Sequence, residues 1–162
     1  MKYDQNMSRS ISAFKYKGKK EYADFYVDEI LKAYEDIFRR SKLDVLVPVP
    51  IHKTKYRERG YNQAELIATG IGQKLKIAVD IHLLQRIRKT LPQKELDDKE
   101  RLKNLEQAFV LNRKEMKETY HKVLLVDDIY TTGSTIEACA KLLMDAGVRE
   151  VMYTSICIGQ GY

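Results

Sequence analysis

The first half of the chain shows a helical pattern of apolar positions followed by a strand-like one. Between Tyr22 and Phe38, apolar residues recur at spacings of three and four, which predicts one long amphipathic helix. The stripe consists of Ala23, Val27, Ile30, Leu31, Tyr34 and Phe38. The β-branched run that follows, from Leu43 to Pro50, predicts a buried strand, and its two prolines predict that the strand ends in a loop.

The middle of the chain carries a basic loop, a second helix and an irregular excursion. We expect a loop over Ile51–Gly60 and then a helix over Asn62–Leu75, because Asn62 and Glu65 have the spacing of a capping box. Over Ile81–Asn104 the charges are mixed and the periodicity is weak, until the apolar run Ala108–Leu111. This segment is expected to leave the core.

A strand, a helix and a second strand are predicted in the last third of the chain. The apolar runs Lys122–Val126 and Glu150–Ile158 predict the strands. Between them, Ser134–Ala146 has helical spacing, with Ser134 and Glu137 as a second capping-box pair and Gly147 as the stop signal. Strands separated by helices predict an α/β fold with a mostly parallel central sheet flanked by helices, and ligands on such sheets bind beyond the carboxyl ends of the strands.

Length and composition fit a single domain over residues 1–162. The chain has 162 residues, 44% of them hydrophobic, and shows no internal repeat or linker-like segment. No segment approaches the ~18 consecutive apolar residues that span a bilayer, and the N-terminus has no apolar core of a signal peptide. We therefore expect a cytoplasmic protein without membrane insertion. Cys139 and Cys157 lie in apolar runs and are expected to be buried, reduced thiols.

The basic balance of the chain narrows the class of partner. A formal net charge of +6 favours anionic partners, either nucleic acid or a polyphosphate metabolite. Tyr16 stands among Lys15, Lys17, Lys19 and Lys20, a mixture that can hold single-stranded nucleic acid or form an ordinary basic surface. Charge alone does not choose between these readings.

The segment from Val126 to Thr135 carries the clearest candidate chemistry. Its loop residues are Thr131, Thr132, Gly133, Ser134 and Thr135. This hydroxyl-rich loop opens a helix, where N–H groups and the helix dipole suit a phosphate. No lysine follows the glycine as in a Walker A loop, which disfavours nucleoside triphosphate hydrolysis. Asp127 and Asp128 would accept hydrogen bonds from vicinal hydroxyls, so the segment suits a ribose 5-phosphate, whereas Ser134 alone is explained as well by a helix cap.

This segment resembles the motif of type I phosphoribosyltransferases that binds 5-phosphoribosyl-1-pyrophosphate (PRPP): four apolar residues, two acids, then a threonine- and glycine-rich loop. The resemblance implies the type I phosphoribosyltransferase fold, with a small hood or flexible loop beside the sheet. It also implies that Asp127 and Asp128 are the catalytic-site acids that contact the ribose 2- and 3-hydroxyls, while Thr131 to Thr135 hold the 5-phosphate. Mg²⁺ would join the pyrophosphate to the sugar, with no metal ligand assigned directly to the protein.

A second resemblance, to the ComF family of competence proteins, covers nearly the whole chain. It rests on Phe14-Lys-Tyr-Lys-Gly18, on Pro48-Val-Pro50 with Tyr56-Arg-Glu-Arg-Gly-Tyr-Asn-Gln63, and on spaced positions from Leu84 to Phe109. The resemblance makes the loop after the first strand the pyrophosphate-facing loop. Its expected contributors are Arg57, Arg59 and Gly60.

The same resemblance assigns the hood to approximately residues 1–20 and 82–108. Four polar residues of the second part are candidates to close over pyrophosphate and exclude water. They are Arg86, Arg88, Lys89 and Gln93. An exposed polar connection explains this segment equally well.

Two functions stay open at this stage. One is a ComF-like domain that binds PRPP and Mg²⁺ and acts in DNA uptake during natural competence, with single-stranded DNA and the competence machinery as partners. The alternative is a metabolic phosphoribosyltransferase that transfers the ribosyl group to a base or amine. ComF relatives commonly carry a four-cysteine zinc site ahead of the Phe14 segment, so the chain is expected to be either a truncation or a zinc-free relative. The sequence indicates neither the molecule that would accept the ribosyl group nor the oligomeric state.

Overall fold

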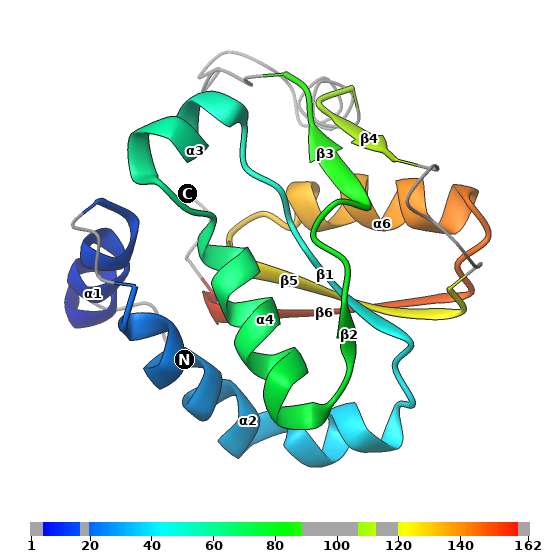
Figure 1. Cartoon of the computed structure of the whole chain (residues 1–162), viewed down its shortest axis with the longest axis horizontal. Coiled ribbons are helices and arrows are strands. Elements are labelled where there is room, and N and C mark those ends of the chain that lie inside the picture. Colours follow the sequence, from blue (N-terminus) through cyan, green and yellow to red (C-terminus); the bar gives the residue numbers. More distant parts are fainter. Residues whose placement is uncertain (1–4, 17–19, 89–106, 113–119, 159–162) are drawn as a thin grey trace.

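The computed structural model describes residues 5–16, 20–88, 107–112 and 120–158. Its centre is a four-stranded parallel sheet in the order β2-β1-β5-β6 (Figure 1). The strands are β1 (Val45–Pro48), β2 (Ala78–Val79), β5 (Lys122–Tyr130) and β6 (Glu150–Ile158). Leu46, Leu124 and Met152 lie side by side across the middle of this sheet. The predicted α/β class is therefore confirmed.

Helices cover both faces of the sheet (Figure 1). One face carries α1 (Gln5–Tyr16), α2 (Tyr22–Arg40) and α4 (Gln63–Leu75), and the other carries α6 (Ser134–Asp145). Alternate side chains of the central strands divide between the two faces, so that Leu46 packs in the core with α2 and α4, and Val47 in the core with α6. Because both faces are buried, the strands form continuous apolar runs in the sequence.

A small antiparallel sheet lies beside the main one. It consists of β3 (Leu84–Arg86) and β4 (Phe109–Leu111), and its side chains Leu84 and Phe109 are buried in the core formed with α6. The excursion after Ile81 thus begins and ends in the core, although β3 was too short to give a periodic signal. The predicted hood residues Lys89 and Gln93 lie outside the described residues.

The loop predicted over Ile51–Gly60 contains a short helix, α3 (Lys53–Arg59). The helix begins where the ring nitrogen Nδ1 of His52 accepts a hydrogen bond from the N–H of Thr54, at 3.3 Å. It ends at Gly60, whose φ of 77° is in the left-handed region. None of the residues in α3 is buried, so it has no apolar stripe to indicate a helix.

Several predicted boundaries and contacts need correction. Strand β5 continues to Tyr130 instead of ending at Val126, because the long strand β6 pairs with it throughout, including Asp127 opposite Ser155. Gly133, not Ser134, is the residue that precedes α6, and no side chain caps that helix. Tyr34 is 48% exposed and therefore lies outside the buried stripe of α2.

Other local predictions are confirmed. Asn62 caps α4, since its side-chain oxygen accepts a hydrogen bond from the N–H of Ala64 at 3.2 Å. Cys139 and Cys157 are buried and form no disulfide. None of the helices in the described part of the chain is long and apolar enough to cross a membrane.

Candidate active site

The two loops singled out from the sequence follow neighbouring strands. From β1 the chain passes through α4 to β2 on one side, and from β5 it passes through α6 to β6 on the other. The connections therefore diverge between β1 and β5, and such a switch point leaves a crevice beyond the carboxyl ends of the strands. The loop that leads to α3 and the loop that leads to α6 both begin at this edge of the sheet.

The loop between β5 and α6 is shaped around Gly133. This glycine has a φ of 83°, and a Cβ atom there would lie 2.5 Å from the hydroxyl oxygen of Tyr130. Thr131 and Thr132 are exposed, and the hydroxyls of Thr132 and Ser134 lie 3.0 Å apart. A tight loop with several hydroxyl groups thus stands directly before the N-terminus of a helix of 12 residues, the arrangement that proteins use to hold phosphate groups.

Two neighbouring carboxylates, Asp127 and Asp128, lie in the last part of β5 and contact different elements. The Oδ2 atom of Asp128 is 2.6 Å from the ammonium nitrogen of Lys15 in α1. The Oδ1 atom of Asp127 accepts a hydrogen bond from the backbone N–H of Asp128 at 2.8 Å. Burial, followed by the negative charge of Asp128, raises the pKa of Asp127 to about 7. The charge of Lys15 lowers the pKa of Asp127, but burial and the charge of Asp128 outweigh it.

The other neighbours of Asp127 come from α6 and β3. Burial raises the pKa of the Cys139 thiol, and the charge of Asp127 raises it further. Burial lowers the pKa of Arg86, whereas the nearby charges of Cys139 and Asp127 raise it. Arg86 also lies over the ring of Phe109, 5.1 Å from its centre. Asp127 thus lies in the field of a cation from β3, and Asp128 contacts a cation from α1.

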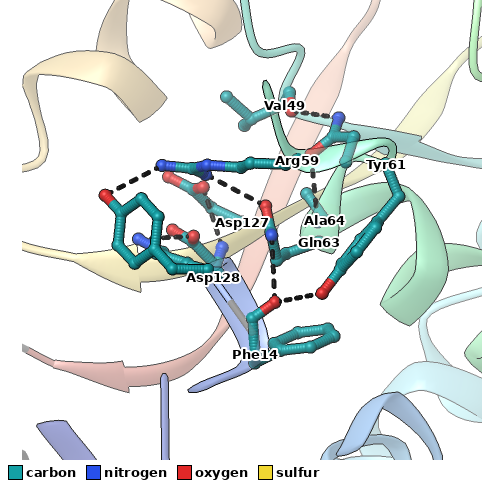
Figure 2. A network of polar contacts seen from close by, with 11 residues as sticks. Phe14, Val49, Arg59, Tyr61, Gln63, Ala64, Asp127 and Asp128 are labelled. Atoms are coloured by element: carbon teal, nitrogen blue, oxygen red, sulfur yellow. Dashed lines mark hydrogen bonds and ion pairs between the residues drawn. The ribbon is translucent and has the colours of Figure 1, made fainter. Parts of the chain in front are cut away.

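Arg59, at the end of α3, forms the centre of a hydrogen-bond network beside the acid pair (Figure 2). One of its terminal nitrogens donates to the buried side chain of Gln63 at 3.1 Å, and the other donates to the hydroxyl of Tyr16 at 3.2 Å. Gln63 in turn donates to the carbonyl oxygen of Phe14 at 3.2 Å, and the Tyr61 hydroxyl donates to the same oxygen. The Nε atom of Arg59 is buried and has no hydrogen-bond partner among the described residues. Its guanidinium is therefore held in place with one donor unsatisfied.

Positive charge accumulates around this network. Burial lowers the pKa of Lys55, and the charges of Arg59, Arg86 and Lys15 lower it as well. These cations come from α3, β3 and α1, so the fold brings together charges that repel one another. A polyanionic ligand in their midst would relieve that repulsion.

A pocket of about 410 Å³ lies between α3 and β3. Arg57 and Arg86 both line it, together with Lys53, His82 and the aromatic ring of Tyr56. The structure thus brings together two arginines that the sequence analysis placed in different parts of the site. We call this space the α3–β3 pocket.

The remaining predicted residues lie elsewhere. Arg59 faces α1 and does not line the α3–β3 pocket, and neither does Gly60. Arg88 is exposed and donates to Gln107 at 2.9 Å near the base of the β3–β4 pair. Within the described ranges, no group of three His, Cys, Asp or Glu side chains could hold a metal ion.

Sequence reasoning missed the roles of two residues, Lys15 and Gln63. Lys15 was one lysine among several in a basic segment, and nothing local distinguishes the one that meets Asp128. Gln63 stood in the sequence only as the last residue of the segment Tyr56–Gln63. Its burial at the start of α4, which requires hydrogen-bond partners, is visible only in the structure.

Comparison with known proteins agrees with this geometry. The model of the phosphoribosyl transferase domain family matches residues 56–158. Competence protein F of Haemophilus influenzae is 33% identical over 157 residues, which are 92% of this chain and 66% of that protein. Competence protein ComFC of Bacillus subtilis is 28% identical over 145 residues, covering 90% of this chain and 56% of that protein. The chain thus spans between about half and two thirds of the length of these relatives.

A solved structure described as the allosteric regulatory enzyme of purine biosynthesis supports the same fold. It aligns with a TM-score of 0.51 and 18% identity, over 83% of this chain and 25% of that one. At this identity the likeness concerns the fold alone. The family match and the competence-protein relatives show that the chain belongs to the phosphoribosyl transferase domain family and, within it, to the ComF family.

Proposed function

We propose that this chain binds PRPP together with Mg²⁺ at the carboxyl end of β5. The observation that carries the proposal is the continuous segment in which two carboxylates are followed by the tight, hydroxyl-rich loop before α6. In the proposed complex, the N–H and hydroxyl groups of Thr131 to Thr135 hold the 5-phosphate. Asp127 and Asp128 accept hydrogen bonds from the ribose hydroxyls, since ionised carboxylates are acceptors and hydroxyls are donors.

The pyrophosphate group has a cationic environment available on the α3 side. Arg57 and Arg86 line the α3–β3 pocket, and Arg59 lies on the side of α3 nearer α1. Guanidinium groups suit the oxygens of a diphosphate because they donate in a fixed, forked geometry. We propose that the pyrophosphate lies between these arginines.

Mg²⁺ fits this site as a companion of the ligand. The described residues offer no cage of three protein ligands, and Mg²⁺ is commonly held by substrate phosphates and waters with few protein oxygens. When bound, the ion would neutralise charge on the departing pyrophosphate. The residues of the chain would orient the sugar and, through Asp127 and Asp128, favour positive charge developing at its C1 atom.

Calorimetric titration with PRPP in the presence of MgCl₂ tests this proposal. We expect saturable binding by the wild type and at least roughly tenfold weaker binding by the double variant Asp127→Asn/Asp128→Asn, since two charged acceptors are lost. The double variant Asp24→Asn/Asp36→Asn, in two exposed acids of α2, is the matched control because it also removes two negative charges. Absence of binding by the wild type would refute the proposal.

We further propose that the domain acts in the cytoplasm in DNA uptake during natural competence. The relatives named as competence proteins support this role, and so does the ring of Tyr16, which is 70% exposed beneath the guanidinium of Arg59 and could stack on a base. Fluorescence anisotropy with a labelled single-stranded oligonucleotide should show binding that weakens steeply as salt is raised. Binding that is absent or independent of salt would contradict this part.

A metabolic phosphoribosyltransferase is distinguished by turnover. In that reaction the bond from C1 to pyrophosphate breaks, pyrophosphate departs with the bonding electrons, and an acceptor nitrogen adds to C1 and loses a proton. Measurement of pyrophosphate release with a panel of bases and amines therefore separates the two roles. Release that depends on one acceptor would favour metabolism, and binding without release would favour the competence role.

A further inference from the structure

Three consecutive residues at the end of α1 contact both loops of the site. The carbonyl oxygen of Phe14 accepts hydrogen bonds from Gln63 and Tyr61, which lie beyond α3 (Figure 2). Lys15 forms its ion pair with Asp128 at the end of β5, and Tyr16 accepts a hydrogen bond from Arg59. The last carbonyls of a helix have no partner within the helix, so Phe14 can be anchored from outside. This anchoring holds the side chain of Lys15 over β5.

The Lys15–Asp128 ion pair is partly buried, unlike the surface pairs of this protein. The two side chains are 18% and 17% exposed, whereas the pair between Arg40 and Asp36 on α2 is 83% and 87% exposed. Water screens an exposed pair and reduces its effect to little, but a pair shielded from water interacts more strongly. Lys15 is therefore positioned to orient Asp128 and not only to balance its charge.

The site around this pair contains both kinds of charge. Among the described residues, Arg86 of β3 and Cys139 of α6 lie in the field of Asp127, and Cys157 of β6 lies in the fields of Asp128 and Lys15. Lys55 of α3 lies in the field of Lys15, and Arg59 and Tyr16 lie near Lys55. Lys15 contacts Asp128 directly, with its Nζ atom 2.6 Å from the Oδ2 atom of Asp128. The ion pair thus fixes the orientation of the carboxylate that would accept from a sugar hydroxyl.

We propose that Lys15 is a positioning residue of the sugar-binding site, which holds Asp128 in the orientation that accepts a ribose hydroxyl. The inference rests on the proposed binding of PRPP. It means that α1 is an integral part of the site, because the same helix carries Lys15 and is anchored through Phe14. A ligand would find the side chain of Asp128 already oriented by its ion pair with Lys15, which lowers the cost of ordering it on binding.

Four single variants and one double variant test this role by PRPP titration. Lys15→Met keeps the length of the side chain and the helix propensity but removes the charge, and we expect about 10- to 100-fold weaker binding, the loss typical of one charge-assisted hydrogen bond. Lys15→Arg should restore most of the affinity. Lys74→Met is the matched control, because Lys74 pairs with Asp28 at the surface between α4 and α2, and it should bind like the wild type. The cycle is completed by Asp128→Asn and the double variant.

The double-mutant cycle shows whether Lys15 acts through Asp128. If it does, Lys15→Met should change the affinity less than about threefold in the Asp128→Asn background. Full additivity would overturn the inference, since Lys15 would then act on the ligand directly. Wild-type affinity in Lys15→Met would overturn it as well while leaving the proposed function intact, whereas a wild type that does not bind PRPP would overturn both.

A second measurement separates positioning from simple loss of folding. Carboxyl carbon NMR resonances report the pKa of Asp127, which the charge of Lys15 lowers. That pKa should rise in Lys15→Met and stay unchanged in Lys74→Met, with both variants unfolding cooperatively near the wild-type temperature. An unchanged pKa of Asp127 in folded Lys15→Met would contradict the role.

Discussion

Replacement of Gly133 by alanine is a sharp test of the loop geometry. The residue has a φ of 83°, and a new Cβ atom would lie 2.5 Å from the hydroxyl oxygen and 3.0 Å from Cζ of Tyr130. The left-handed conformation costs alanine about 1–2 kcal/mol. Tyr130 must also move, and it is stacked on Tyr153 with ring centres 5.2 Å apart and an interplanar angle of 16°. Loss of that stacking costs about 0.5–1.5 kcal/mol.

Together these costs predict that Gly133→Ala lowers the free energy of unfolding by about 1.5–3.5 kcal/mol. For a chain of this size, that corresponds to a fall in Tm of roughly 3–14 °C, measured by thermal unfolding monitored by circular dichroism. PRPP binding should weaken in parallel, because the loop that we propose to hold the 5-phosphate must shift.

Gly60 offers the matched control for this prediction. It has a similar φ of 77°, but a Cβ atom there would meet nothing within 4 Å. Gly60→Ala should therefore lower the free energy of unfolding only by the cost of the left-handed backbone conformation, about 1–2 kcal/mol. Tyr130→Phe, which removes the nearest atom, should recover part of the stability lost in Gly133→Ala. Equal losses in Gly133→Ala and Gly60→Ala would refute the argument from the Tyr130 contact.

Three further predictions concern the acid pair, the loop after β1 and the thiols. Asp127 has a raised pKa, so the folded state binds its proton more tightly than the unfolded state; its contribution to stability is full at low pH and is lost as the pH rises through about 7. Asp127→Asn should therefore raise Tm relative to the wild type more at pH 8 than at pH 5, and an equal change at both would contradict the assignment. Asn62 caps α4 and donates a hydrogen bond to the carbonyl oxygen of Val49 at 3.0 Å. Asn62→Ala should therefore lower the free energy of unfolding, measured with urea, by about 2 kcal/mol. A decrease below about 0.5 kcal/mol would count against these two hydrogen bonds. Burial raises the pKa of Cys139 and raises that of Cys157 to about 11. A thiol reagent should therefore label neither cysteine in the native protein and both after unfolding. Rapid labelling of the native protein would contradict their burial.

The segment from β5 to β6 shows how much of the structure can be predicted from the local sequence pattern. Its strand, loop and helix are contiguous, and each has its own signal in the order of apolar, acidic, hydroxyl and glycine residues. The α/β class and the place of the candidate phosphate loop followed from that order. The end of β5 did not, because pairing with β6 extends the strand through two aspartates that disfavour strands by themselves.

The fold class, the helices with a buried stripe, and the segment with the acids and the hydroxyl-rich loop could thus be predicted from the order of the residues. The assembled fold was needed to show which lysine meets Asp128, which face of α3 carries Arg59, and that Arg57 shares a pocket with Arg86. The difference lies in the range of the interactions. Hydrophobic periodicity and turn chemistry act between residues close in the chain, whereas these pairings join elements that meet only when α1, α3 and β3 assemble around the end of the sheet.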